Sequence, residues 1–190
     1  MSDITARIKA DASFQKLMYT ALMECGTLYD GRERIVEILQ GTLAKGDYQE
    51  ALQLGTIHKG DLHQVSTNGV HGAWLAHTHG EEDGQKYHPP SLSDILVTIQ
   101  RAVEDPTHKG ISVIVTVEGF YILYPTRDLI KRLHREINYD KTLAKQIEDS
   151  YPKIFTEMKS GTVSPTTLTE TLKRYNIVCE FIARDSHVTT

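Results

Sequence analysis

The segments Leu75-Ala76-His77-Thr78-His79-Gly80 and Pro89-Pro90-Ser91-Leu92-Ser93-Asp94 place two imidazoles, a hydroxyl and a carboxylate within twenty residues. The apolar residues 72–76 predict a buried strand, and alternation along a strand turns residues i and i+2 to the same face. We therefore expect His77 and His79 to point the same way. Two prolines, Ser91 and the periodic apolar residues that follow predict a loop entering a helix, with Asp94 in its first turn.

This pattern indicates a zinc site. His77, His79 and Asp94 give Zn²⁺ three protein ligands, and a catalytic zinc keeps its fourth position for water. Each half of the pattern has an ordinary explanation when taken alone. S-x-x-D before an apolar run is also a helix capping box, and an H-x-H pair arises readily by chance in a chain with nine histidines. The order strand, H-x-H, loop, S-x-x-D, helix is much rarer by accident.

These residues resemble the JAMM metalloproteases, also called MPN-type or JAB proteases. The family pattern is a distant glutamate, then H-[ST]-H, then S-x-x-D, matched here by residues 77–79 and 91–94. The family's glutamate follows a helix and opens a strand. Met23-Glu24-Cys25-Gly26 is similar to a looser form of that opening, and Glu24 lies 53 residues before His77. The resemblance covers roughly residues 12–125.

The chain departs from the family pattern at the loop. Eleven residues, 80–90, separate His79 from Ser91, more than the family usually has, and Gly80 stands where a proline is common. The longer loop bears on the shape of the substrate cleft more than on the metal ligands. His88 is a candidate fourth zinc ligand or substrate contact, and Trp74 is a second candidate for substrate binding or gating.

The resemblance implies a fold and a reaction. The fold would be α/β, a mixed β-sheet flanked by helices as in MPN/JAB and cytidine-deaminase-like proteins, with a helical C-terminal extension. With Zn²⁺ as cofactor, Glu24 would accept a proton from water, and Ser91 would donate a hydrogen bond to the oxyanion. The bond cleaved would be a peptide or isopeptide bond after the C-terminal tail of ubiquitin or a ubiquitin-like protein.

Two other classes of protein were considered. Zinc nucleobase deaminases also use a zinc-activated water and a glutamate, but they need a P-C-x-x-C signature, which this sequence lacks. The second alternative is a non-catalytic MPN-like scaffold that binds ubiquitin-like partners. Such scaffolds usually lack one or more metal residues, so the complete set here favours the enzyme.

Composition limits the remaining possibilities. The chain has 190 residues, 39% of them apolar, a net charge of −4 and a pI near 6.1. The sequence has no cluster of Lys and Arg residues, so it gives no indication of binding to nucleic acid or to an anionic membrane. The apolar runs are too short to cross a bilayer, and the N-terminus lacks a signal peptide's apolar region. We therefore expect a cytosolic protein in which Cys25 and Cys179 are reduced core thiols.

The other expected elements follow from periodicity. The sequence predicts a JAMM-like domain at 1–139 and a helical extension at 140–190, which ends in a possible edge strand. Within 32–71 the resemblance favours strands, although 48–54 alone reads as helix, and the histidines there are expected to lie on the surface. The other predicted elements are a helix at 14–22, strands at 27–29, 111–117 and 120–124, helices at 129–137, 140–158 (interrupted at Pro152) and 165–175, and a strand at 176–183.

Overall fold

A fully buried strand lies near the centre of the sheet. Every residue of β5 (Ile111–Val115, ISVIV) is buried, as its mostly β-branched and apolar sequence predicts. β5 pairs in parallel with β4 (Trp74–Thr78), and the crossover between them contains helix α4 (Leu92–Glu104). The computed structural model describes residues 2–42, 50–61, 74–80, 84–104, 110–136 and 139–184.

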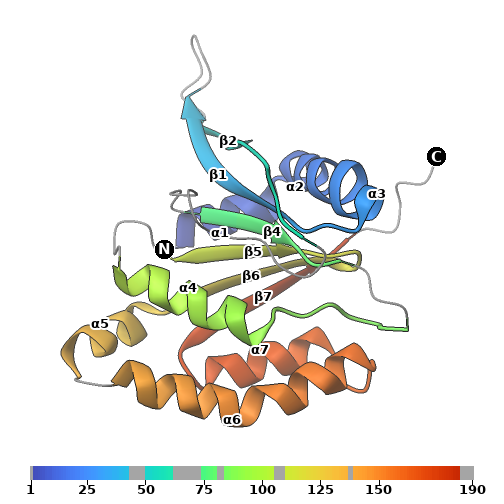
Figure 1. Ribbon diagram of the computed structural model, residues 1–190. Coiled ribbons are helices and arrows are strands. Elements are labelled where there is room, and N and C mark those ends of the chain that lie inside the picture. The colour runs from blue at the N-terminus through green and yellow to red at the C-terminus, as the bar shows by residue number, and fades with distance from the viewer. Residues whose placement is uncertain are drawn as a thin grey trace.

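The sheet is mixed, with strand order β2-β1-β4-β5-β6-β7 and with β3 paired to β1 (Figure 1). All described pairings except β4–β5 are antiparallel. The expected α/β fold with a mixed sheet flanked by helices is therefore confirmed. The remaining strands are β1 (Arg34–Thr42), β2 (Glu50–Leu54), β3 (His58–Lys59), β6 (Gly119–Pro125) and β7 (Ile177–Ala183).

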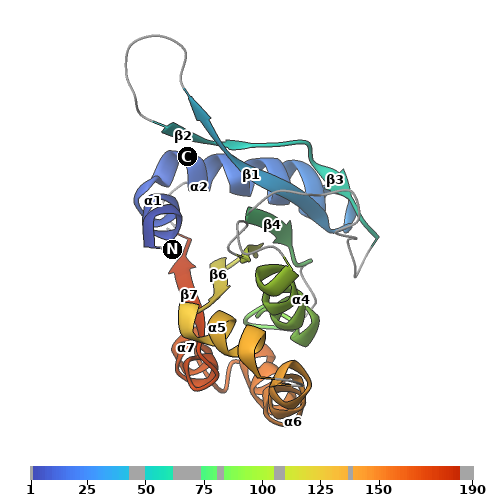
Figure 2. The ribbon, with the colours of Figure 1, turned by 90° about the vertical axis from the view of Figure 1, so that its left-hand side faces the viewer.

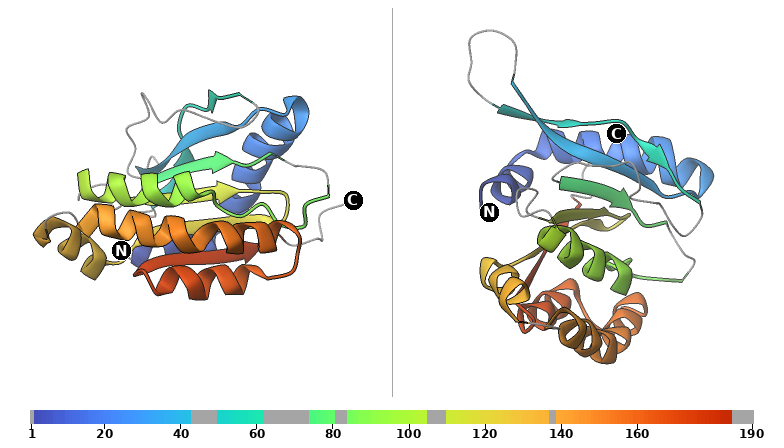
Figure 3. Two further views of the ribbon diagram at one scale, coloured as in Figure 1. Left: turned by 60° about the horizontal axis from the view of Figure 1, so that its bottom comes forward. Right: turned by 60° about the vertical axis from the view of Figure 1, so that its left-hand side comes forward.

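Helices pack on both faces of the sheet (Figure 2). One hydrophobic cluster joins α1, α2 and η1 to Val36, Ala76 and Val113 of the sheet. A second cluster contains residues of the four helices α4, α5, α6 and α7 together with Ile114 and Leu123 on the other face. Figure 3 shows α4, α6 and α7 as neighbouring helices. The helices are α1 (Ser2–Ala10), α2 (Ala12–Tyr19), the π-helix η1 (Thr20–Thr27), α3 (Leu28–Asp30), α5 (Arg127–Arg135), α6 (Tyr139–Lys159) and α7 (Pro165–Lys173).

The N-terminal helix is longer than predicted. Of the two possible N-cap residues, Asp11 and Ser13, it is Asp11 that caps α2, by accepting a hydrogen bond from the Phe14 N–H at 2.8 Å. The prediction of a strand at 27–29 is wrong, because the chain continues as η1 and α3. Gly26 does not end the helix. Gly31 does, with a φ of 73° that suits a glycine C-cap.

Other local predictions had mixed outcomes. The helical interpretation of 48–54 is wrong for residues 50–54, which pair as β2 with β1, while 48–49 lie outside the described residues. Pro152 does not interrupt α6. Cys179 is buried as predicted, but Cys25 is exposed, so it is not a core thiol. His58 is exposed as predicted, and the other histidines of this stretch, His63 and His71, lie outside the described residues.

Elements beyond residue 139 share their core with the central part of the chain. The predicted edge strand is confirmed, since β7 pairs with β6 along its whole length. Ile147 on α6 is fully buried in the same cluster as Ile95 and Ile99 of α4. Residues 140–184 therefore complete the hydrophobic layer that supports α4.

Because this layer is shared, we expect Ile147→Ala to destabilise sheet and helices together. Truncating the buried side chain should lower the free energy of unfolding by about 2–5 kcal/mol. Urea unfolding would be followed by the fluorescence of Trp74, the chain's one tryptophan, and by circular dichroism. Both midpoints should fall equally. A shift in circular dichroism alone would show that residues 140–184 unfold independently.

Candidate metal centre

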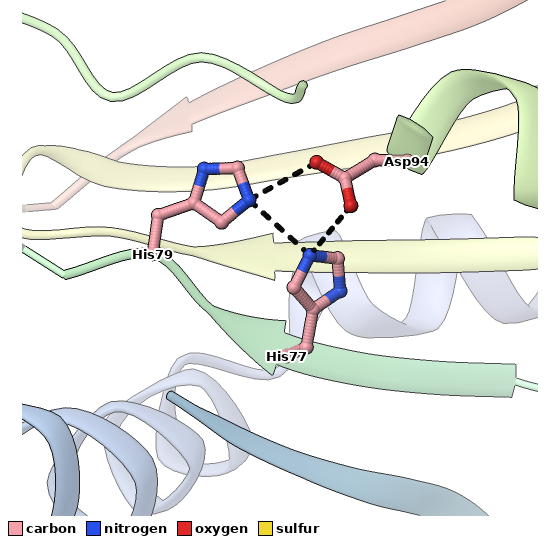
Figure 4. A group of neighbouring side chains, drawn as sticks. All are labelled: His77, His79 and Asp94. Carbon is pink, nitrogen blue, oxygen red and sulfur yellow. Dashed lines mark hydrogen bonds and ion pairs between the residues drawn. The ribbon is translucent and has the colours of Figure 1, made fainter. Parts of the chain in front are cut away.

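The three predicted ligands, His77, His79 and Asp94, lie together where β4 ends and α4 begins (Figure 4). His77 Nε2 lies 3.0 Å from Asp94 Oδ1, and His79 Nε2 lies 3.0 Å from Asp94 Oδ2. The two Nε2 atoms are 3.3 Å apart. Among the residues that the structure describes, these three form the only group of His, Cys, Asp or Glu side chains arranged to hold a metal ion.

Strand alternation produces this convergence. His77, on β4, and His79, just after its last residue, point to the same side of the sheet, while Thr78 between them points to the other. There the Thr78 hydroxyl accepts a hydrogen bond from the Arg34 N–H at 2.8 Å and contacts the Thr27 hydroxyl at 2.6 Å. The threonine therefore anchors the end of β4 from behind, as the strand period predicts.

The donor atoms suit zinc. Ligands about 2.0–2.1 Å from a tetrahedral zinc ion lie about 3.3–3.4 Å from each other. The 3.3 Å between the two Nε2 atoms matches that spacing, and each Nε2 atom lies 3.0 Å from one oxygen of the Asp94 carboxylate. Two imidazoles and a carboxylate are also ligand types that zinc accepts. The three residues can therefore hold a metal ion without a large rearrangement.

Asp94 serves as helix cap and candidate ligand at once. Its Oδ2 accepts a hydrogen bond from the Ser91 N–H at 2.6 Å, and its own N–H donates to Ser91 Oγ at 3.2 Å. This reciprocal pair is a capping box at the start of α4. The two interpretations of S-x-x-D are thus compatible, because the cap holds the carboxylate beside the histidines.

The charges of the group reinforce one another. Burial opposes ionisation of Asp94, but His77 and His79 outweigh it and hold the pKa of Asp94 well below its usual value. Burial likewise disfavours protonated His79, yet Asp94 raises its pKa, with help from Glu33 and from the Pro89 carbonyl, which accepts a hydrogen bond from the His79 ring. Such a bond to the second ring nitrogen orients metal-binding histidines.

Glu33 is a carboxylate at this site that the sequence analysis missed. β1 pairs antiparallel with β4, with Ile35 opposite His77, so continuing the register by two residues puts Glu33 opposite His79. Burial raises the pKa of Glu33, and the charges of both histidines and of Asp94 act on it. The Glu33 backbone is fixed by an N–H bond to Asp61 (2.8 Å) and by a bond from the Gly60 N–H (2.9 Å).

The structure does not bring Glu24 to the histidines. Glu24 lies on η1, whose Leu22 and Met23 pack against the Ala76 face of the sheet, opposite to the His77 face. Its side chain is exposed and accepts a hydrogen bond from Thr20 at 3.0 Å. The expected position of Glu24, at a helix-to-strand junction that faces the site, is therefore wrong, because the chain stays helical there.

The two candidates for substrate contact, His88 and Trp74, also lie outside the ligand group. His88 is buried, and its backbone N–H and ring Nδ1 bind the Glu118 carboxylate at 2.5 and 3.0 Å. Burial opposes ionisation of Glu118, but the bonds from His88 lower its pKa. His88 thus ties the loop to the β5–β6 turn. Trp74 packs against the α1/α2 cluster on the face opposite to His77. Their suggested roles toward substrate remain predictions.

Comparisons with known proteins add no assignment: no protein-family model, curated protein or solved structure matches the chain. In the described ranges, no helix combines the length and apolar character needed to cross a membrane. The assignment of a metal site therefore rests on the arrangement of His77, His79 and Asp94.

We expect the purified protein to bind about one zinc ion per chain, because one complete ligand group is present. Asp94→Ala should abolish this binding in elemental analysis after dialysis. Asp128→Ala is a matched control, since Asp128 also lies in the first turn of a helix, α5. Equal zinc content in wild type and Asp94→Ala would contradict the assignment.

Zinc should stabilise the protein more as the pH rises. Without metal, the raised His79 pKa contributes stability below about pH 6.5 that is lost as the pH rises through the folded pKa. The depressed Asp94 pKa contributes stability above about pH 4 that is lost as the pH falls through its folded value.

Zinc requires neutral imidazoles, so its binding releases protons. The increase in melting temperature on adding zinc should therefore be larger at about pH 8 than at about pH 6. Asp94→Ala measured in parallel should show no zinc-dependent increase at either pH. An increase that is independent of pH would indicate that zinc binds elsewhere.

Proposed function

We propose that the protein is a zinc-dependent hydrolase that cleaves a peptide or isopeptide bond after the C-terminal tail of ubiquitin or a ubiquitin-like protein. The observation that carries the proposal is the convergence of His77, His79 and Asp94, with Glu33 opposite His79. His77, His79 and Asp94 would hold the zinc. Zinc bound at such a site would act as a Lewis acid and would lower the pKa of a coordinated water toward neutrality.

Glu33 is the general base in this proposal. It lies on the same face of the sheet as His77 and His79, and its burial raises its pKa toward the range suited to proton transfer. Its carboxylate takes the proton of the attacking water and passes it to the nitrogen of the leaving amine. Glu24, the residue favoured by the sequence pattern, is exposed and bonded to Thr20.

Ser91 stabilises the oxyanion. Its Oγ accepts the Asp94 N–H, so the hydroxyl proton is not used in that bond. The proton can point toward the carbonyl oxygen as negative charge develops there. A single donor of this kind contributes about 2.7–4 kcal/mol to transition-state stabilisation in comparable sites.

The choice of a ubiquitin-like tail rests on the resemblance of residues 77–79 and 91–94 to the JAMM pattern. An exposed part of the same sheet face supports an extended substrate. Alternation puts Leu39 on the face of β1 that carries Ile35 and Glu33, and 41% of Leu39 is exposed. An extended tail with apolar residues would lie across this face of β1 toward the metal ligands, because both edges of β1 are already paired.

We expect Glu33→Gln to lower kcat by about 10²- to 10⁴-fold while zinc content is unchanged, because the variant keeps the ligands and loses the base. The assay would use zinc-loaded protein and ubiquitin, or a ubiquitin-like protein, carrying a fluorescent amide at its C-terminus. Glu24→Gln is the matched control and should retain wild-type activity.

The reverse result, a loss of activity in Glu24→Gln alone, would assign the base to Glu24. A zinc-loaded wild type that cleaves none of these amides would reject the proposed substrate class and favour a binding scaffold.

A further inference from the structure

We infer that Tyr151 on α6 is a positioning residue of the metal centre, acting through residues 89–91. The inference rests on the proposed function, since it concerns the same ligands. Tyr151 belongs to the C-terminal helical elements, outside the part of the chain that resembles the JAMM pattern.

Three consecutive residues before α4 each make one bond that bears on the site. The Pro89 carbonyl accepts a hydrogen bond from the His79 ring. The Pro90 carbonyl accepts one from the Tyr151 hydroxyl. The Ser91 N–H donates to Asp94 Oδ2. The central bond, from Tyr151, therefore lies between the one that orients His79 and the one that holds Asp94.

Tyr151 is well suited to hold this segment. Its side chain is 2% exposed and belongs to the buried cluster that includes Ile95 of α4 and Ile147 of α6. Its ring contacts Phe155 with centroids 6.0 Å apart. A phenol fixed by packing on one side presents its hydroxyl at a defined position, so the Pro90 carbonyl has a defined partner.

A second contact ties the chain just before residues 89–91 to α6. The Lys86 N–H donates to the carbonyl of Lys159, the last residue of α6, at 2.9 Å. Just beyond, Gly161 has a φ of 75°, and a Cβ there would lie 2.5 Å from Lys86 Cδ. The chain at Lys86 is therefore in contact with the C-terminal end of α6 before it enters α4.

Loss of the Tyr151 bond should act on two of the three ligands. The Pro90 carbonyl belongs to the same peptide unit as the Ser91 N–H, so without this bond that peptide can rotate and move the donor for Asp94. The adjoining Pro89 carbonyl, the acceptor for the His79 ring, then loses its fixed neighbour. His77 lies within β4 and is held there by the pairing of β4 with β1, where it stands opposite Ile35. The expected result is weaker metal binding in a protein that still folds.

The test compares Tyr151→Phe with Tyr175→Phe. The control removes a hydroxyl that also bonds to α6, at Ser150 Oγ (2.7 Å), but does not touch residues 89–91. Zinc affinity would be measured by competition with a chromophoric chelator. Tyr151→Phe should bind zinc about 10- to 100-fold more weakly, the usual effect of losing an outer-shell partner. Tyr175→Phe should bind as tightly as wild type.

A second measurement in metal-free protein keeps this inference separate from the proposed function. In wild type, the His79 ring proton that is bonded to Pro89 should give a slowly exchanging NMR signal, which Tyr151→Phe should lose and Tyr175→Phe should keep. Unchanged zinc affinity with an unchanged His79 signal in Tyr151→Phe would overturn the inference. If wild type binds no zinc, the proposed function fails, and the His79 signal alone decides whether Tyr151 positions this segment.

Discussion

The carboxylate of Asp94 is the point on which the arrangement depends. It accepts the Ser91 N–H at the start of α4 and lies 3.0 Å from both His77 and His79 at the end of β4. A helix start and a strand end are thereby fixed to each other by one side chain. A buried carboxylate in this position is tolerated because a backbone donor and two imidazoles compensate for its lost hydration.

Around this carboxylate the two faces of the sheet have different tasks. The face covered by α1, α2 and η1 is apolar, with Thr27, Thr78 and Arg34 as a small buried polar group at its end. The other face carries the ligands and Glu33, and helices α4, α5, α6 and α7 cover the part of it formed by β5, β6 and β7. The site lies at the carboxyl end of β4, which pairs in parallel with β5. The carboxyl ends of parallel strands are a common location for ligand sites in α/β proteins.

The local part of this arrangement was predictable from the sequence. A β-branched run, an H-x-H pair after an apolar strand and a helix cap each depend on neighbours in the chain, so periodicity and capping chemistry identified β5, the histidines and Asp94. Glu33 was not predictable in this way, because its place opposite His79 depends on the register between β1 and β4. The strand predicted at 27–29 failed because Gly31, rather than Gly26, ends the helix. The bond between Tyr151 and Pro90 joins residues 61 apart in sequence, which no local pattern reports.

The position of α6 in the chain also affects when the site is completed during synthesis. Asp94, the last ligand, precedes Tyr151 by 57 residues (151 − 94). At a typical elongation rate of roughly 5–20 residues per second, translation of that interval takes about 3–11 s. During this time a nascent chain already contains every ligand but lacks the complete α6 and all of α7. Assembly of the centre is thus coupled to completion of the C-terminal layer, so a ribosome-bound or truncated chain carries the ligands without the support that the finished protein gives them.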